Sequence, residues 1–276
     1  MKVLLFGNCQ LWAIKETLKF NSSVSVTYIA CYSTDIISTE FTTLIQDSDI
    51  IITQPIKNEY RGSTYLSTSY IISNARTDCK IIVADSCHFE FYYFDLTYKY
   101  HNGSLLKVPN DYHYNGLFDS FKSSLPIAHY IDNYVNNPTL KSCAELEAMA
   151  NNSLAGLKLR YEQNCERYGQ HTNVSILTTY DFIKDNYKKC LLFYSMNHPT
   201  NHLIQHLCRE ICKIVGVECD ILDTVDVLGG SQKSILYACI QPMVEFDIRD
   251  HQPLTCSMTT PEDIARVYYD TYKTIL

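Results

Sequence analysis

The chain has 276 residues, of which 46% are hydrophobic and 19% charged, and its formal net charge is −7. This composition can bury a sizeable core and excludes wholesale disorder. The acidic balance and the scattered Lys and Arg argue against a nucleic-acid binder, which needs basic surface to neutralise phosphates. No apolar run reaches the ~18 residues of a membrane span. The apolar start breaks at Gly7, too early for a signal peptide, so we expect a cytoplasmic protein.

The first third of the chain alternates between strand-like and helix-like segments. Short apolar runs predict strands over residues 3–6, 24–31, 49–53 and 80–84. The intervening segments predict helices over residues 11–20, 39–46 and 63–76. This rhythm, with its short connections, predicts an α/β fold with a mostly parallel open sheet and crossover helices.

The remainder of the chain differs from this pattern. Residues 85–137 are crowded with Tyr and His, which suits either a functional surface or a Tyr-rich packing layer. The second half is helix-rich. We expect a helix over about 142–168 with a capping box at Ser142, a buried strand over 191–194, a helix to about 215 and a final helix from 261. We predict one α/β domain over 1–276, with a possible subdivision into a sheet-rich half, 1–137, and a helix-rich half, 138–276.

Twelve cysteines are an unusual number for a cytoplasmic chain. Most lie inside apolar segments, where a thiol behaves as a small hydrophobic group, and no C-x-x-C pair occurs. A chain of this size does not need a disulfide framework. We therefore expect reduced cysteines, with Cys208 and Cys212 as two packed core thiols.

The segment Gly7-Asn8-Cys9-Gln10 is the sharpest chemical feature, because it follows the first predicted strand and opens the first predicted helix. Ligands of open α/β sheets bind outside the carboxyl ends of the strands. A cysteine at the head of a helix benefits from the positive end of the helix dipole, and free N–H groups there can stabilise a thiolate or an oxyanion. The alternative is a buried cysteine in a tight turn.

His198-Pro199 has the same placement, after a predicted strand and before a helix. A histidine there can act as a general base for a thiol or a hydroxyl, although spacing alone slightly favours a helix-capping or merely exposed histidine. His198, His202 and His206 recur every four residues, but no H-E-x-x-H motif or acidic third ligand accompanies them, so we expect no metal site.

Four short motifs occur in the order found in one family. They are Gly7-Asn8-Cys9-Gln10, Thr53-Gln54-Pro55-Ile56, Asn110-Asp111-Tyr112-His113 and the segment from Phe193 to Thr200. Together they resemble the WcbI-like family of capsular polysaccharide biosynthesis proteins, which are regarded as acetyltransferases. The resemblance covers about residues 1–216. The stretch Asp85-Ser86-Cys87-His88 departs from it, and the region after Gly216 matches nothing in it.

The resemblance implies binding of coenzyme A or acetyl-coenzyme A and O-acetylation of a sugar or glycan. It points to Cys9 and His198 as the reactive pair, with Asn8 beside them. It also implies that coenzyme A is bound by residues of the shared motifs, namely Gly7, Gln10, Gln54, Tyr112 and His113. On sequence grounds alone, Arg61 and Arg76 are candidates for its diphosphate.

Two chemical routes fit these residues. Cys9 could form an acyl-enzyme with His198 as its base. Alternatively, His198 could activate the sugar hydroxyl for direct attack, with Asn8 and the Cys9 amide as an oxyanion hole. A module that binds coenzyme A, a nucleotide or a glycan without catalysis is the competing class. An esterase of the SGNH-like type is a third, although the first motif lacks its serine.

Overall fold

The computed structural model describes residues 1–20, 23–216, 219–223, 226–229, 234–251 and 260–276. The chain divides into two compact units. The first unit comprises Met1–His88, Leu154–Asp185 and His198–Leu228, and the second comprises Phe89–Ser153, Asn186–Asn197 and Gly229–Leu276. The predicted subdivision after residue 137 does not match these boundaries, because each unit is assembled from separate stretches of chain. A single domain over the whole chain stays a prediction.

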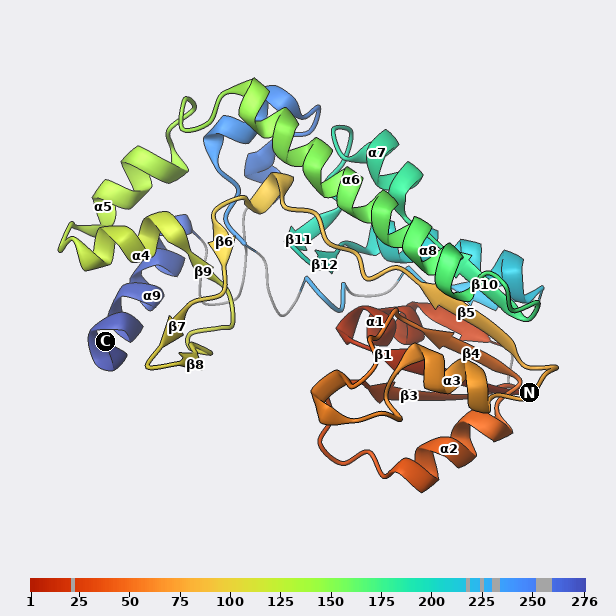
Figure 1. Ribbon diagram of the computed structural model, residues 1–276. Helices are drawn as coiled ribbons and strands as arrows, with labels where there is room; N and C mark the ends of the chain where they lie inside the picture. The colour runs from red at the N-terminus through yellow and green to blue at the C-terminus, as the bar shows by residue number, and fades with distance from the viewer. Residues whose placement is uncertain (21–22, 217–218, 224–225, 230–233, 252–259) are drawn as a thin grey trace. The chain divides into compact units, whose positions relative to one another are not determined.

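A five-stranded parallel sheet lies at the centre of the first unit (Figure 1). Its strands are β1 (Lys2–Gly7), β3 (Ser25–Ala30), β4 (Ile50–Thr53), β5 (Lys80–Ala84) and β10 (Val174–Leu177). They lie in the order β10-β5-β4-β1-β3, and every neighbouring pair is parallel. The predicted α/β fold with a parallel sheet is therefore confirmed. The direction in which the chain builds the sheet reverses between β1 and β4, as in doubly wound folds, which bind ligands at that switch point.

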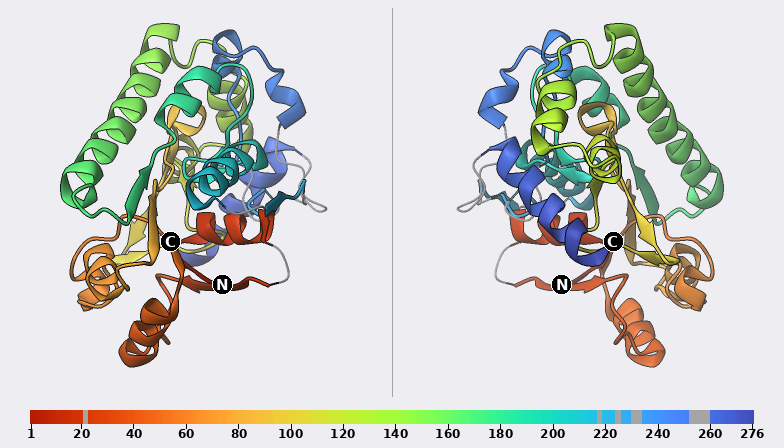
Figure 2. Two further views of the ribbon diagram at one scale, coloured as in Figure 1. Left: turned by 90° about the vertical axis from the view of Figure 1, so that its right-hand side faces the viewer. Right: turned by 90° about the vertical axis from the view of Figure 1, so that its left-hand side faces the viewer.

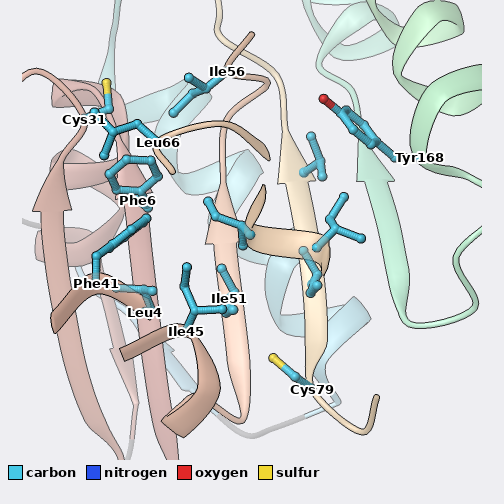
Figure 3. Packing of buried hydrophobic residues seen from close by; sticks show 14 residues of the cluster. Leu4, Phe6, Cys31, Phe41, Ile45, Ile51, Ile56, Leu66, Cys79 and Tyr168 are labelled. Atoms are coloured by element: carbon cyan, nitrogen blue, oxygen red, sulfur yellow. The ribbon is translucent and has the colours of Figure 1, made fainter. Parts of the chain in front are cut away.

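Alternating residues of the strands send apolar side chains to both faces of the sheet. One face forms a cluster in which Leu4, Phe6 and Ile51 pack against Phe41 and Ile45 (Figure 3). On the other face, α1 (Cys9–Thr17) packs against β1 and also against α8 (Asn201–Val215) (Figure 2). Both faces are covered, which explains why the strands read as continuous apolar runs.

The helices and short strands of the first unit confirm most of the predicted elements and correct three. Its own elements are α1 (Cys9–Thr17), β2 (Leu18–Phe20), α2 (Ser38–Asp47), η1 (Tyr60–Gly62), α3 (Thr68–Asn74), β12 (His198–Pro199), α8 (Asn201–Val215) and β13 (Cys219–Ile221). Two helices, α6 (Cys143–Tyr168) and α7 (Tyr180–Asn186), contribute to both units.

The first helix ends at Thr17, before the predicted end at residue 20, because the next residues pair as β2 with antiparallel β13. The third helix begins only at Thr68, where the Ser67 side chain accepts the N–H of Tyr70 as an N-cap. Strand β10 was not predicted at all, although its sequence, Val-Ser-Ile-Leu, is a short apolar run.

Cys212 and Cys219 form a disulfide, with their Cα atoms 6.6 Å apart. The expectation of reduced cysteines throughout is therefore wrong for this pair. The sequence pointed to Cys208 as the neighbour of Cys212, but Cys208 is buried with a free thiol. Cys212 lies in the last turn of α8, and Cys219 is the first residue of β13. Cys256 lies outside the described residues.

The second unit has an aromatic core. Its elements are η2 (Phe91–Tyr93), β6 (Leu96–Thr97), β7 (Tyr100–His101), β8 (Ser104–Leu105), β9 (His113–Tyr114), α4 (Asn115–Lys122), α5 (Ile127–Tyr130), η3 (Ile131–Val135), β11 (Phe193–Ser195), η4 (Ala238–Met243), η5 (Ile248–His251) and α9 (Pro261–Ile275). Tyr92, Tyr93, Tyr112 and Tyr114 are buried, so most of the Tyr-rich stretch is a packing layer. Tyr98 and Tyr100 are exposed.

Both predicted helix starts of the second half are confirmed. Ser142 and Glu145 exchange the hydrogen bonds of a capping box, and so do Thr260 and Asp263. In the part of the chain that the structure describes, no helix is both long and apolar enough to cross a membrane.

Candidate functional site

The turn between β1 and α1 lies at the switch point of the sheet. Asn8 is the N-cap of α1, because its side-chain Oδ1 accepts the N–H of Gln10 at 2.9 Å. Its own N–H donates to Gln54 Oε1 at 2.8 Å, and Gln54 directly follows β4. The two strands that flank the switch point are thus joined at their carboxyl ends by one side chain. Cys9 is the first residue of α1 and is half-buried.

Gly7 permits this connection. A Cβ atom at position 7 would lie 2.6 Å from Gln54 Oε1 and 2.7 Å from Leu11 Cδ1. Both distances are far below van der Waals contact, so any side chain here would displace the Gln54 amide. The glycine of the first motif is therefore explained by close packing, and a ligand-binding role is not needed to account for it.

Gln10 and Gln54 bind other parts of the protein. Gln10 is buried, and its amide both donates to the Cys87 carbonyl and accepts the Cys87 N–H, each at 2.9 Å. Gln54 Nε2 also donates to Gln10 Oε1 at 3.3 Å. These two side chains tie the loops after β1, β4 and β5 together. Both side chains therefore hold the Cys9 turn, and their contact with coenzyme A stays a prediction.

His198 lies beside Cys9, although 189 positions separate them in the chain. Cys9 Sγ and His198 Nε2 are 3.6 Å apart, within the reach of a thiol–imidazole hydrogen bond. The direction of that bond depends on the histidine tautomer. His198 stands three residues before α8, and α8 packs against α1, so two helices begin near this pair. The N-termini of helices carry partial positive charge and favour anions.

Burial sets the resting charge of the pair. Burial raises the pKa of the Cys9 thiol, although the N–H groups of Cys9 and Gln10 act in the opposite direction. Burial also lowers the pKa of His198 to about 4. At neutral pH the pair therefore rests as a thiol and a neutral imidazole. A neutral imidazole can accept a proton, which is the property that a general base requires.

Two more residues lie at this edge of the sheet. The Tyr28 hydroxyl donates to the carbonyl of Asn8 at 3.1 Å, and burial raises its pKa. Arg61 follows β4, and its exposed guanidinium donates to the carbonyl of Tyr32, which follows β3. Arg61 therefore lies at the carboxyl edge of the sheet, the edge that also carries Cys9.

Arg76 lies at the opposite edge. It pairs with Asp49, 2.8 Å away, and with Asp78, 3.0 Å away, and these aspartates precede β4 and β5 respectively. Of the two arginines predicted as candidates for the diphosphate, Arg76 therefore does not lie at the edge that carries Cys9, because the amino and carboxyl edges of a parallel sheet face opposite ways.

Tyr112 and His113 belong to the second unit. His113 is fully buried, with Nδ1 2.7 Å from the Tyr272 hydroxyl and Nε2 3.2 Å from the Leu106 carbonyl. Because both ring nitrogens face protein partners, His113 acts as a core histidine and we do not retain it as a ligand contact. The Tyr112 hydroxyl donates to Asn197 Oδ1 at 2.7 Å.

Some residues of the site escaped sequence reasoning. Tyr28 carries no local signal, because only the register of β3 against β1 places its hydroxyl at Asn8.

The stretch from Asp85 to His88, which directly follows β5, has a structural role. Asp85 is buried and accepts hydrogen bonds from the Thr178 hydroxyl and the Thr179 N–H, which fixes the end of β10, while Cys87 binds Gln10. Among the described residues, no group of His, Cys, Asp or Glu is arranged to hold a metal ion.

Comparison with known proteins adds two findings. The sequence matches the family model for WcbI, a polysaccharide biosynthesis enzyme, over residues 2–220. A solved structure of WcbI, a novel polysaccharide biosynthesis enzyme, is similar with a TM-score of 0.76 and 17% identity, covering 99% of this chain and 95% of that chain. That structure is the native protein without a disulfide bond between coenzyme A and one of its cysteines. At this identity the likeness shows a shared fold. No curated protein matches the chain.

The close approach at Gly7 yields a first prediction. Gly7→Ala should lower the free energy of unfolding by about 1–3 kcal/mol, because overpacking a rigid site forces neighbouring groups to move. Gly156→Ala is the matched control. Its added Cβ meets only Arg160 Nη1 at 3.4 Å, and alanine in mid-helix should stabilise by up to about 1 kcal/mol. Urea unfolding of both variants measures the difference, and equal stabilities would refute the packing argument.

The depressed pKa of His198 yields a second prediction. In the unfolded chain a histidine titrates near pH 6.5, so between about pH 4 and 6.5 the unfolded state binds more protons. The wild type should therefore lose stability as the pH falls through this window, by about 3 kcal/mol in total from this residue. His198→Gln lacks that contribution, so its stability should fall less steeply over the same window. Unfolding curves measured at each pH test this. If the stabilities of the wild type and of His198→Gln fall equally steeply over this window, His198 is not neutral and desolvated in the folded protein.

Proposed function

Because the chain belongs to the WcbI family of polysaccharide biosynthesis enzymes, we propose that it transfers an acyl group, acetyl above all, from coenzyme A to a hydroxyl of a sugar or glycan. The observation that carries this proposal is the Cys9–His198 pair, with 3.6 Å between thiol sulfur and ring nitrogen, at the switch point of a doubly wound sheet. A thiol beside a neutral imidazole is the arrangement of an activated nucleophile and its base.

The surroundings of the pair suit an acyl thioester with a diphosphate. The start of α1 offers first-turn N–H groups, and the start of α8 lies beside it. Among the described residues, the Asn8 side-chain nitrogen has no hydrogen-bond partner, so it can donate to a substrate oxygen. Arg61 supplies an exposed cation at the same edge. The WcbI structure, described in terms of coenzyme A and one of its cysteines, supports the choice of this donor.

We propose the covalent route. The Cys9 sulfur attacks the acyl carbon of the donor while His198 Nε2 accepts the thiol proton. The bond between the acyl carbon and the sulfur of coenzyme A breaks, and that sulfur leaves with the proton from His198. In the second half, a sugar hydroxyl attacks the Cys9 thioester, His198 accepts the hydroxyl proton, and the Cys9 thiol is restored by that proton. The N–H of Cys9 and the Asn8 amide are placed to stabilise the oxyanion of each step.

Geometry favours this route over direct attack. His198 Nε2, the atom that must accept the proton, faces Cys9 Sγ. In direct attack the same atom would have to face the sugar hydroxyl, and Cys9 would contribute only its backbone N–H. Both routes need a neutral His198, so pH dependence alone does not separate them, whereas replacement of the Cys9 sulfur does.

Replacement of the reactive pair gives the test of the proposed function. Cys9→Ala and His198→Gln should each lower the transfer of labelled acetyl to glycan acceptors by roughly 10²-fold or more, because each removes a group that acts in the transition state. The wild type should also carry one labelled acetyl on Cys9 when the acceptor is withheld. Mass spectrometry of the Cys9 peptide detects it.

Three outcomes would change the proposal. Wild-type transfer by Cys9→Ala would eliminate the covalent route. Release of free acetate without any acceptor, at the rate of the first step, would identify an esterase. Tight binding of coenzyme A without acetyl transfer to any glycan would identify a non-catalytic binding module.

Arg61 gives an independent test of where the donor binds. Arg61→Gln should weaken binding of coenzyme A by about tenfold, because hydrogen bonds to charged groups contribute about 1.5–3 kcal/mol. Arg76→Gln is the matched control: it also removes one surface arginine, but at the amino edge of the sheet. Titration calorimetry measures both. An equal loss of affinity in the two variants would place the diphosphate elsewhere or reduce its recognition to net charge.

A further inference from the structure

The second unit contains a cavity of about 650 Å³ that lies entirely within that unit. Three segments line it: the end of η3 with Val135 and Asn136, the stretch from Leu236 to Arg249, and Pro261 at the start of α9. Its size falls in the range of small-ligand sites, which is roughly 300–1,000 Å³. The Cys9 pair belongs to the first unit, so the chemistry of the proposed function leaves this cavity unexplained.

One wall of the cavity is held rigidly. The side chain of Gln241 donates to the carbonyl of Phe246 at 2.9 Å and accepts the N–H of Ile248 at 3.0 Å. The amide nitrogen and the amide oxygen of Gln241 therefore both form hydrogen bonds with the backbone of this wall. Asp247 accepts hydrogen bonds from the backbone and side chain of Arg249, each at 3.0 Å or less. A wall fixed in this way offers a ligand a shape that exists before binding, which lowers the entropic cost of association.

Other polar groups of the lining remain available. Within the described residues, the Asn136 carboxamide, the Glu245 carboxylate and Arg249 Nη1 make no hydrogen bond to protein. Together they provide donors and acceptors in the neutral and charged forms that bind hydroxyl groups. Apolar lining residues alternate with them, among them Leu236, Phe246 and Ile248. A pyranose has this same combination of hydroxyl edges and an apolar C–H face that packs on an aromatic ring.

The charges of the lining argue against an anionic ligand such as a diphosphate. Arg249 is paired with Asp247, which holds the pKa of that carboxyl at about 2, so its charge is already balanced. Glu245 then leaves the lining with a net charge of −1, from one cation and two carboxylates. A diphosphate, whether of coenzyme A or of an activated sugar, would meet repulsion here. The site therefore favours an uncharged polar ligand.

We infer that this cavity binds a neutral saccharide. The inference rests on the cavity and on the membership of the chain in a family of polysaccharide biosynthesis enzymes, and it does not require that Cys9 transfers an acyl group. Phe246 supplies the stacking surface, and Glu245 and Asn136 bind hydroxyls at the rim.

The test uses the full chain, without coenzyme A, and neutral methyl glycosides of glucose, galactose, mannose and N-acetylglucosamine as probes. Methyl resonances of Val135, Leu236 and Ile248 report on the cavity, and those of Ile51, in the core of the first unit, serve as a reference. At least one glycoside should shift the three cavity methyls saturably and leave Ile51 unchanged.

Substitutions then locate the contacts. Glu245→Gln and Phe246→Leu should each weaken that binding by about tenfold, through loss of a charged acceptor and of a flat aromatic face. Asp119→Asn is the matched control, because it removes one exposed carboxylate on α4, away from the lining. It should leave the affinity unchanged.

Several results would overturn the inference: no cavity shift with any of the four glycosides, shifts with inorganic diphosphate or glucosamine alone, or equal weakening by Asp119→Asn. The proposed function fails separately. If the protein binds a glycoside here but transfers no acetyl group, this inference holds and the proposed function fails. If it transfers acetyl but no glycoside shifts the cavity methyl resonances, the proposed function holds and this inference fails.

Discussion

The close approach of Gln54 to the turn after β1 is the constraint on which the candidate site depends. One amide oxygen accepts the Asn8 N–H across the switch point of the sheet, and only a glycine at position 7 leaves room for it. Asn8 in turn caps α1 and fixes Cys9 as its first residue. The position of Cys9 beside His198 thus depends on a hydrogen bond between two strand ends.

Desolvation determines what that thiol can do. The same packing that fixes the turn removes water from Cys9 and His198, which disfavours both charged forms and leaves a neutral pair. Neutral partners store no ion-pair energy in the resting state. The charge separates only when the thiol attacks, at the head of α1, where helix N–H groups can stabilise it. In the proposed reaction, the thiol therefore stays protonated until it attacks the thioester.

The sequence predicted the parts of the fold that are local. Apolar runs between helix-like segments located β1, β3, β4 and β5. The resemblance named Cys9 and His198 as a pair and the structure brings them together, although His198 lies in β12, outside the five-stranded sheet. Features that depend on register or on long-range geometry were inaccessible. In the sequence, Arg61 and Arg76 are equally plausible as cations for a diphosphate. Only the folded sheet separates them, with Arg61 at its carboxyl edge and Arg76 at its amino edge. Likewise, nothing local to Gln10 indicates that its side chain is buried. It is buried because its amide binds the backbone of Cys87, which lies 77 positions away in the chain.

The two units have different cores, and the two proposals assign them different tasks. An aliphatic sheet with polar groups at one edge suits chemistry at strand ends, whereas the Tyr-rich second unit, with its half-polar cavity, suits recognition of a ligand. The central claim is that Cys9 and His198 act as one catalytic unit, and a double-mutant cycle on kcat/KM for acetyl transfer tests it most directly. If they do, Cys9→Ala combined with His198→Gln should be no slower than the slower single variant, because groups that act together are lost together. Multiplication of the two single losses would contradict the account.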